Sequence, residues 1–122
     1  MDSEVRKTLE GARSVLLEHG HTKNVLVDRE GRVCLRGAIF SAVHGYHRMV
    51  NWDIPWGSAS LVTAAEKALG FPDNHATIET MSVLPQWNNR AETTLDDILD
   101  LFAKALGEDV PAVPVEREAV LA

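Results

Sequence analysis

Apolar residues near the N-terminus recur at the spacing of one face of a helix. Ser3 can cap this helix, because its hydroxyl can accept a hydrogen bond from an unpaired backbone N–H of the first turn. Gly20 is the expected stop, since glycine readily takes the left-handed conformation in which many helices end. The pattern therefore predicts a helix from Ser3 to Gly20, whose buried stripe consists of Val5, Leu9, Ala12 and Leu16.

The spacing then changes from helical to alternating. Val25 and Val27 precede a short polar loop that ends in Gly31, and Val33 and Leu35 follow it. Two β-branched runs around such a loop are typical of a β-hairpin with the glycine at positive φ. Because a lone hairpin is only marginally stable in water, one face of it should lie on the helices.

Two helices are predicted in the middle of the chain. Residues 37–43 are small and apolar, and they predict a central helix that ends at Gly45. Ser58 or Ser60 can cap the next helix, and Gly70 is its expected stop.

A further helical turn is predicted around Ile78 and Met81, which are three positions apart. Pro85 should prevent this turn from continuing, because proline lacks the backbone donor and its ring clashes with the preceding turn.

The last helix has the clearest start signals. Thr94 and Asp97 have the spacing of a capping box, and Gly107 is the expected stop. Together the patterns predict a mostly helical α+β fold, with four or five helices and one β-hairpin between the first and the second helix. The core expected for this fold contains Leu9, Leu16, Val43, Leu69, Trp87, Ile98, Leu99 and Phe102.

Composition indicates one ordinary globular domain. The chain has 122 residues, of which 45% are hydrophobic and 25% are charged, close to the averages for globular domains. We expect the domain to span residues 1–107 and residues 108–122, which contain two prolines, to form an extended tail. The lone Cys34 rules out an intramolecular disulfide, and with no signal-peptide pattern at the N-terminus it favours a cytoplasmic location.

Charge and hydropathy argue against two classes of partner. The formal net charge is −6, and no basic stripe is available to neutralise phosphates, so we expect no direct binding to nucleic acid. No apolar run approaches the ~20 residues that a bilayer crossing needs, so we expect no membrane association. A protein partner remains as the expected class.

Three short motifs resemble those of one family. They are Cys34-Leu35-Arg36-Gly37-Ala38, Trp87-Asn88-Asn89 and Thr94-x-x-Asp97-Ile98-Leu99. The chain resembles a family of short actinobacterial and actinobacteriophage proteins known only as a domain of unknown function. The resemblance covers most of residues 5–106 and fails over residues 46–57 and after Gly107. It implies an actinobacterial or phage origin, and it implies no known activity or cofactor.

The motif residues near the last helix have a structural interpretation. Trp87 can bury its ring while its indole N–H finds a carbonyl, and Asn88 can satisfy backbone groups in the turn that follows. Thr94 and Asp97 cap the helix. We therefore expect these four residues to hold the fold together.

Cys34, His44 and His47 are the candidates for enzyme chemistry. The two histidines are one turn apart if the helix persists, which is half of a metal site, and Cys34 could complete it or act as a nucleophile beside a histidine. A small metal-dependent or cysteine hydrolase is therefore the alternative function. Because closed Cys/His pairs, a phosphate loop and a G-x-S-x-G sequence are all missing, we expect no enzyme, no metal and no cofactor.

A third function follows from the acidic residues before and within the last helix. They could make the protein a decoy for a nucleic-acid-binding protein, although a helix start and a solvated face explain them as well. These residues are Glu92, Asp96, Asp97 and Asp100.

Residues 46–57 hold two of the three tryptophans and the only tyrosine. Aromatic residues, Met and Arg are enriched at interface hot spots, but a long loop can also be pinned by its own aromatics. Since polar residues and a proline interrupt the segment, we expect it to run over the surface with at least one of Trp52 and Trp56 exposed. The predicted function is a non-enzymatic binding or regulatory protein, encoded by a phage, that engages a host protein. The predicted contact residues are Tyr46, Arg48, Met49, Trp52, Ile54 and Trp56.

Overall fold

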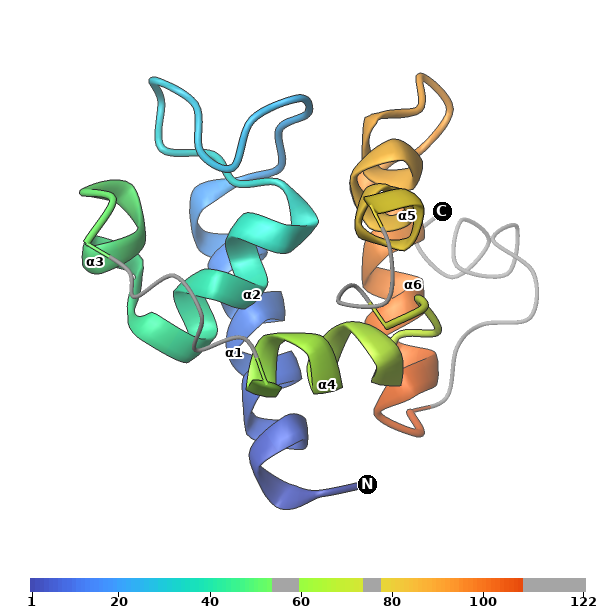
Figure 1. Cartoon of the computed structure of the whole chain (residues 1–122). Coiled ribbons are helices and arrows are strands. Elements are labelled where there is room, and N and C mark those ends of the chain that lie inside the picture. The colour runs from blue at the N-terminus through green and yellow to red at the C-terminus, as the bar shows by residue number, and fades with distance from the viewer. Residues whose placement is uncertain (54–59, 74–77, 109–122) are drawn as a thin grey trace, which may run out of the picture.

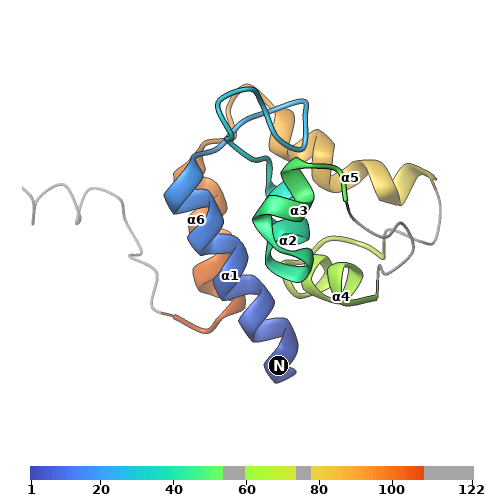
Figure 2. The same ribbon diagram turned by 90° about the vertical axis from the view of Figure 1, so that its left-hand side faces the viewer.

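All regular structure in the described part of the chain is helical. The structure, a computed structural model, describes residues 1–53, 60–73 and 78–108. Its helices are α1 (Ser3–His19), α2 (Leu35–His44), α3 (Tyr46–Val50), α4 (Ser60–Ala68), α5 (Ile78–Asn89) and α6 (Leu95–Ala105) (Figure 1). The central pair is α1 and α2, with α4 and α6 packed on α1, and with α3, α4 and α5 in contact with α2 (Figure 2). None of these helices has the length and apolar character that a membrane crossing requires.

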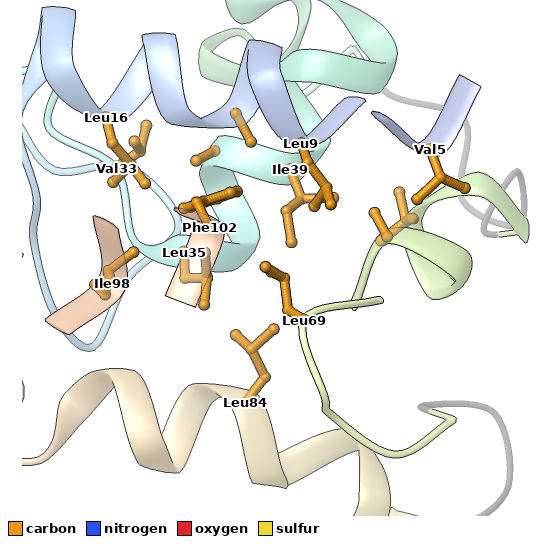
Figure 3. Close-up of a cluster of buried hydrophobic side chains, with 14 of the residues drawn as sticks. Val5, Leu9, Leu16, Val33, Leu35, Ile39, Leu69, Leu84, Ile98 and Phe102 are labelled. Carbon is orange, nitrogen blue, oxygen red and sulfur yellow. The ribbon is translucent and has the colours of Figure 1, made fainter. Parts of the chain in front are cut away.

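One hydrophobic core joins the helices. Figure 3 shows its side chains converging from α1, α2, α5 and α6. The predicted core residues that are buried in it are Leu9, Leu16, Leu69, Ile98 and Phe102. Val43 and Trp87 are only partly buried and pack against it.

Leu99 is a wrong core prediction, because it is only partly buried and does not belong to the core cluster. Ile98, Phe102 and Leu106 recur every four residues on the face of α6 that points to the core. The next residue along a helix is rotated by about 100°, which turns Leu99 away from that face.

The predicted β-hairpin, and with it the α+β fold class, is wrong. The described chain between α1 and α2 makes two isolated bridges and no strand, and both bridges use Val33. One joins Val33 to His21 in parallel, and the other joins it to Val27 in antiparallel orientation. The turn itself is present, since Gly31 has a φ of 83° and its N–H donates to the Asp28 carbonyl at 3.0 Å.

The ladder stops for two reasons. Cys34 already serves as the N-cap of α2, so the chain turns into a helix directly after Val33. Before the turn, Asn24 has a φ of 72°, a left-handed conformation that interrupts the first predicted strand. We call this connection, residues 20–33, the α1–α2 loop.

Pro85 does not end the fifth helix, contrary to the prediction. It lies inside α5, which continues to Asn89. Proline removes one backbone hydrogen bond and kinks a helix, but buried side chains hold α5 on both sides of it. Leu84 is 1% exposed and Asn88 is 0% exposed, so tertiary packing outweighs the local penalty.

The predicted cap of α6 is confirmed, and the predicted cap of α1 is wrong. The capping box of α6 is confirmed, because the Asp97 N–H donates to Thr94 Oγ1 at 3.2 Å and the Thr94 N–H donates to Asp97 Oδ2 at 2.9 Å. The α1 cap is Asp2 and not Ser3, since Asp2 Oδ1 accepts from the Glu4 N–H at 2.7 Å.

Two arginines of α1 hold the chain that leaves α6. The Arg6 Nη2 donates to the Leu106 carbonyl at 3.0 Å. Arg13 forms a bidentate pair with the Glu108 carboxylate, at 2.8 and 2.9 Å. The predicted tail lies beyond this pair, and residues 109–122 are outside the described residues.

Glu108→Gln is expected to lower the thermal midpoint at pH 7 and to have no effect in acid. The hydrogen bonds from Arg13 hold the pKa of the Glu108 carboxyl below its ordinary value. Such a group stabilises the fold above its ordinary pKa, and this contribution is lost as the pH falls through the lowered value. Melting curves of wild type and variant should therefore differ at pH 7 and coincide at about pH 2. Equal midpoints at pH 7 would mean that this exposed pair contributes nothing measurable.

Candidate functional site

Tyr46 anchors α3 to the rest of the domain. Its hydroxyl donates to the Gly31 carbonyl at 2.7 Å, and its ring stacks on His19 with centroids 3.7 Å apart and planes 4° from parallel. Burial raises the pKa of the Tyr46 hydroxyl. Tyr46 therefore joins the α1–α2 loop, the end of α1 and α3, and it does not form a free contact surface.

Met49 also differs from its predicted role, whereas Arg48 is exposed. Met49 is 1% exposed and belongs to the core, so it is unavailable to a partner. Arg48 is exposed, and its Nε donates to the Asp53 carbonyl at 3.0 Å. The remaining predicted contacts, Ile54 and Trp56, lie outside the described residues.

Trp52 presents its ring to solvent. It is 58% exposed, which confirms the expectation that at least one tryptophan of this segment is accessible. Its φ is 58°, a left-handed conformation that is uncommon for a bulky residue. Two backbone hydrogen bonds hold it there, from the Trp52 N–H to the Met49 carbonyl at 3.1 Å and from the Asp53 N–H to the Arg48 carbonyl at 2.8 Å.

Replacing Trp52 should not destabilise the fold. Trp52→Ala should change the free energy of unfolding by less than about 0.5 kcal/mol, because an exposed side chain makes few contacts. Trp52→Gly should raise it by up to about 1 kcal/mol, because glycine takes positive φ without a steric penalty. Urea denaturation measures both. A loss of more than about 2 kcal/mol in Trp52→Ala would mean that the ring is packed against the domain in solution.

Cys34 does not converge with His44 and His47. Cys34 caps the start of α2 and His44 is the last residue of that helix, so about 15 Å of helix axis separates them. The Cys34 thiol is buried, its Sγ accepts from the Gly37 N–H at 3.3 Å, and burial raises its pKa. Burial and the nearby Arg48 lower the pKa of His44.

Nothing in the described residues gathers His, Cys, Asp and Glu side chains in threes as a metal site requires. The alternative of a hydrolase built on Cys34, His44 and His47 therefore lacks the geometry on which it depends.

The acidic residues near α6 share their surroundings with cations. Glu92, Asp97 and Asp100 line a cleft of about 360 Å³ over Trp87 and Leu101. Its other lining residues are Arg90, Thr93 and Lys104. Asp97 is also committed to the capping box. The cleft is therefore of mixed charge, which does not favour a phosphate-mimicking decoy.

Asn88 is the centre of a buried polar cluster. Its Oδ1 accepts from the Leu35 N–H at 3.1 Å and lies 2.8 Å from His21 Nε2. Because a backbone N–H can only donate, this atom is the amide oxygen, and His21 must carry its proton on Nε2. The Asn88 Nδ2 donates to the Thr22 carbonyl at 3.3 Å and to Asn89 Oδ1 at 3.0 Å.

The neighbours of Asn88 in the motif add to the same junction. Asn89 Oδ1 also accepts from the Asn24 N–H at 2.7 Å. The Trp87 ring packs edge to face against the Phe71 ring, with centroids 5.7 Å apart. The backbone carbonyl of Trp87 accepts from the Thr93 hydroxyl at 2.7 Å. The motif thus joins the α1–α2 loop to the start of α2, which is a structural role. The prediction that Asn88 satisfies backbone groups of the turn before the last helix is wrong, because its backbone partners are Leu35 and Thr22.

Gly37 serves the same junction from the other side. A Cβ at this position would lie 2.2 Å from the Leu26 carbonyl oxygen, so only glycine lets the α1–α2 loop pack this closely on α2. The Cys34 motif and the Trp87 motif therefore meet around one loop.

A family profile described as a family of unknown function, DUF6197, matches residues 1–108. The chain belongs to the DUF6197 family. This match supports the predicted resemblance to an uncharacterised domain family. No curated protein and no solved structure matches the sequence significantly.

This DUF6197 domain contains a buried ion pair that the sequence analysis missed. The Arg36 Nε and Nη2 donate to the two carboxylate oxygens of Glu66 at 3.0 and 3.1 Å, and the Glu66 side chain is 1% exposed. A signal was present, because Glu66 falls at helical spacing among the buried apolar residues Val62 and Ala65 of α4 and Leu69, which directly follows this helix.

Proposed function

We propose that this DUF6197 protein is a non-enzymatic binding protein that engages a protein partner through the surface around Trp52. We call it the Trp52 surface, and it consists of the exposed residues His47, Arg48, Asn51, Trp52 and Asp53. Tryptophan and arginine are the residue types most enriched at interface hot spots. The observation that carries the proposal is the exposed ring of Trp52 on a left-handed backbone.

The backbone conformation supports a role beyond stability. A left-handed bulky residue costs roughly 1–2 kcal/mol, and the exposed ring makes few contacts that could repay it. A partner that covers the ring would offset this cost in the complex.

The base of the surface is well fixed. Met49 is buried in the core below it, and Tyr46 holds α3 to the α1–α2 loop. A side chain presented from a rigid base loses less entropy on binding than one on a flexible loop. The Trp52 surface is therefore suited to pre-organised recognition.

The class of partner follows from the net charge and from the resemblance to actinobacterial and actinobacteriophage proteins. The net charge of −6 disfavours nucleic acid and suits a protein with a basic surface. The sequence resemblance to actinobacteriophage proteins supports a host protein as this partner.

A site-specific crosslinking experiment tests the proposal. A photoreactive amino acid is placed at position 51, because Asn51 is exposed beside Trp52 and its replacement keeps the tryptophan ring. A matched protein carries it at position 17, because Leu17 is 61% exposed on α1. In an actinobacterial lysate, position 51 should give one dominant crosslinked protein and position 17 should not.

The captured protein is then purified for affinity measurements. Trp52→Ala should weaken its binding by about thirtyfold or more, which corresponds to about 2 kcal/mol, whereas Leu17→Ala should leave it unchanged. Equal binding by wild type and Trp52→Ala would overturn the proposal.

A further inference from the structure

A small pocket opens where the two motifs meet the α1–α2 loop. Its volume is about 180 Å³, close to the ~150 Å³ of an apolar cavity that holds benzene. Val25, Leu26 and Pro85 form its apolar walls. The polar lining comes from Asn24, Cys34, Arg36, Asn88 and Asn89.

The walls of this pocket are held rigidly. Asn88 is fixed by hydrogen bonds to the loop and to α2. The Arg36 guanidinium is held by the buried carboxylate of Glu66. Leu26 is pressed against Gly37, where no side chain could intervene. Mostly apolar, preformed pockets with a few fixed polar groups are the usual form of small-molecule sites.

Hydrogen-bond accounting leaves Asn89, beside the exposed side chain of Asn24, with unused capacity in the pocket. The Asn89 Oδ1 accepts from the Asn24 N–H and from Asn88 Nδ2. These donors identify the oxygen, so the other amide atom of Asn89 is the NH₂ group. Within the described residues this NH₂ group has no hydrogen-bond partner. Asn89 is one of the residues that line the pocket.

We propose that this pocket binds a small, compact apolar molecule that carries one carbonyl-type acceptor. The apolar body would fill the space between Val25, Leu26 and Pro85, and the acceptor would take its hydrogen bond from Asn89 Nδ2. The site is separate from the Trp52 surface, so it stands or falls independently of the proposed function.

Two probes of the same shape test the chemistry on the full chain. Acetophenone has an aromatic ring and a carbonyl, and ethylbenzene matches its shape without the acceptor. Both are titrated while the NMR signals of the Val25 methyl groups and the Asn89 side-chain amide are followed. Acetophenone should bind with a Kd on the order of 1 mM and shift both signals, and ethylbenzene should bind about tenfold more weakly.

Asn89→Asp separates the hydrogen bond from the packing. Aspartate keeps the oxygen that accepts from Asn24 and Asn88, and it replaces only the NH₂ group. The variant should therefore retain its thermal midpoint within a few degrees and lose acetophenone binding by about tenfold or more, with ethylbenzene binding unchanged.

A blocking variant and a matched control locate the site. Val25→Trp places an indole over the mouth of the pocket and should abolish binding of both probes. Val83→Trp makes the same change at an exposed valine of α5 that does not line the pocket, and it should have no effect.

Cys34 gives an independent readout, because it is the only cysteine of the chain and it lines the pocket. Saturating acetophenone should slow its alkylation by iodoacetamide severalfold, and it should not do so in Val25→Trp. The proposal is overturned if neither probe shifts the signals of Val25 and Asn89, if Val25→Trp binds as wild type does, or if Asn89→Asp weakens both probes equally. Trp52→Ala should bind acetophenone as wild type does, whatever the outcome for the protein partner.

Discussion

Glu66→Gln is expected to lower the free energy of unfolding by about 3–5 kcal/mol. The substitution removes the negative charge from a buried pair, so that the Arg36 guanidinium, whose side chain is 15% exposed, no longer faces the carboxylate that accepts from its Nε and Nη2. A buried charge that loses its partner costs far more than the pair contributes, because its desolvation is no longer offset. Urea denaturation at pH 7 measures the change.

Two matched variants separate this cause from a general loss of packing. Glu92→Gln makes the same change at an exposed glutamate and should cost less than about 0.5 kcal/mol. The double variant Arg36→Met, Glu66→Leu removes both charges and should recover most of the loss, because apolar residues of similar volume often replace a buried pair at little cost. If the double variant is no more stable than Glu66→Gln, the uncompensated charge is not the cause.

Asn88→Leu is expected to cost about 4 kcal/mol. Leucine has a similar volume but leaves the Leu35 N–H, the Thr22 carbonyl and the His21 ring nitrogen without their partner. Each buried polar group left unpaired costs about 1–3 kcal/mol. Urea denaturation measures the total, and hydrogen exchange at the Leu35 amide reports the local loss of protection.

Gln86→Leu is the matched control for Asn88→Leu. It makes the same amide-to-leucine change at an exposed position of the same helix and should cost less than about 0.5 kcal/mol. If both variants have equal stability, the cluster around Asn88 adds nothing beyond the volume of its side chain.

Features set by neighbouring residues could be predicted from the sequence. The capping box of Thr94 and Asp97 depends on residues three positions apart, and the helix that ends at Gly20 depends on one periodic stripe. Both are present because little outside these segments competes with them.

Features set by distant residues could not be predicted in this way. The α1–α2 loop has the composition of a hairpin, but its backbone bonds to side-chain amides of α5 where a ladder would need it. Proline normally ends a helix, but buried residues on both sides of Pro85 keep α5 continuous. The ion pair of Glu66 could not be predicted either, because a glutamate within an apolar stripe does not show which distant cation it binds, here Arg36.

The free NH₂ group of Asn89 could not be predicted from the sequence for a similar reason. Whether a side-chain amide has spare capacity depends on which groups already occupy it, and here they come from Asn24 and Asn88. The exposure of Trp52 was easier to predict, because the polar residues and proline around it already favoured a surface segment.

The anchoring of the α1–α2 loop also sets the order of folding events. The hydrogen bonds that join the loop to α5 connect residues 65 to 67 positions apart in sequence. Closing such a long chain segment costs entropy before any contact forms, so pairings of this kind are made late. On the ribosome the loop cannot reach its native shape until α5 has emerged, although α1 and α2 can already pair. Substitutions at Asn88 should therefore speed unfolding and leave the rate of folding nearly unchanged.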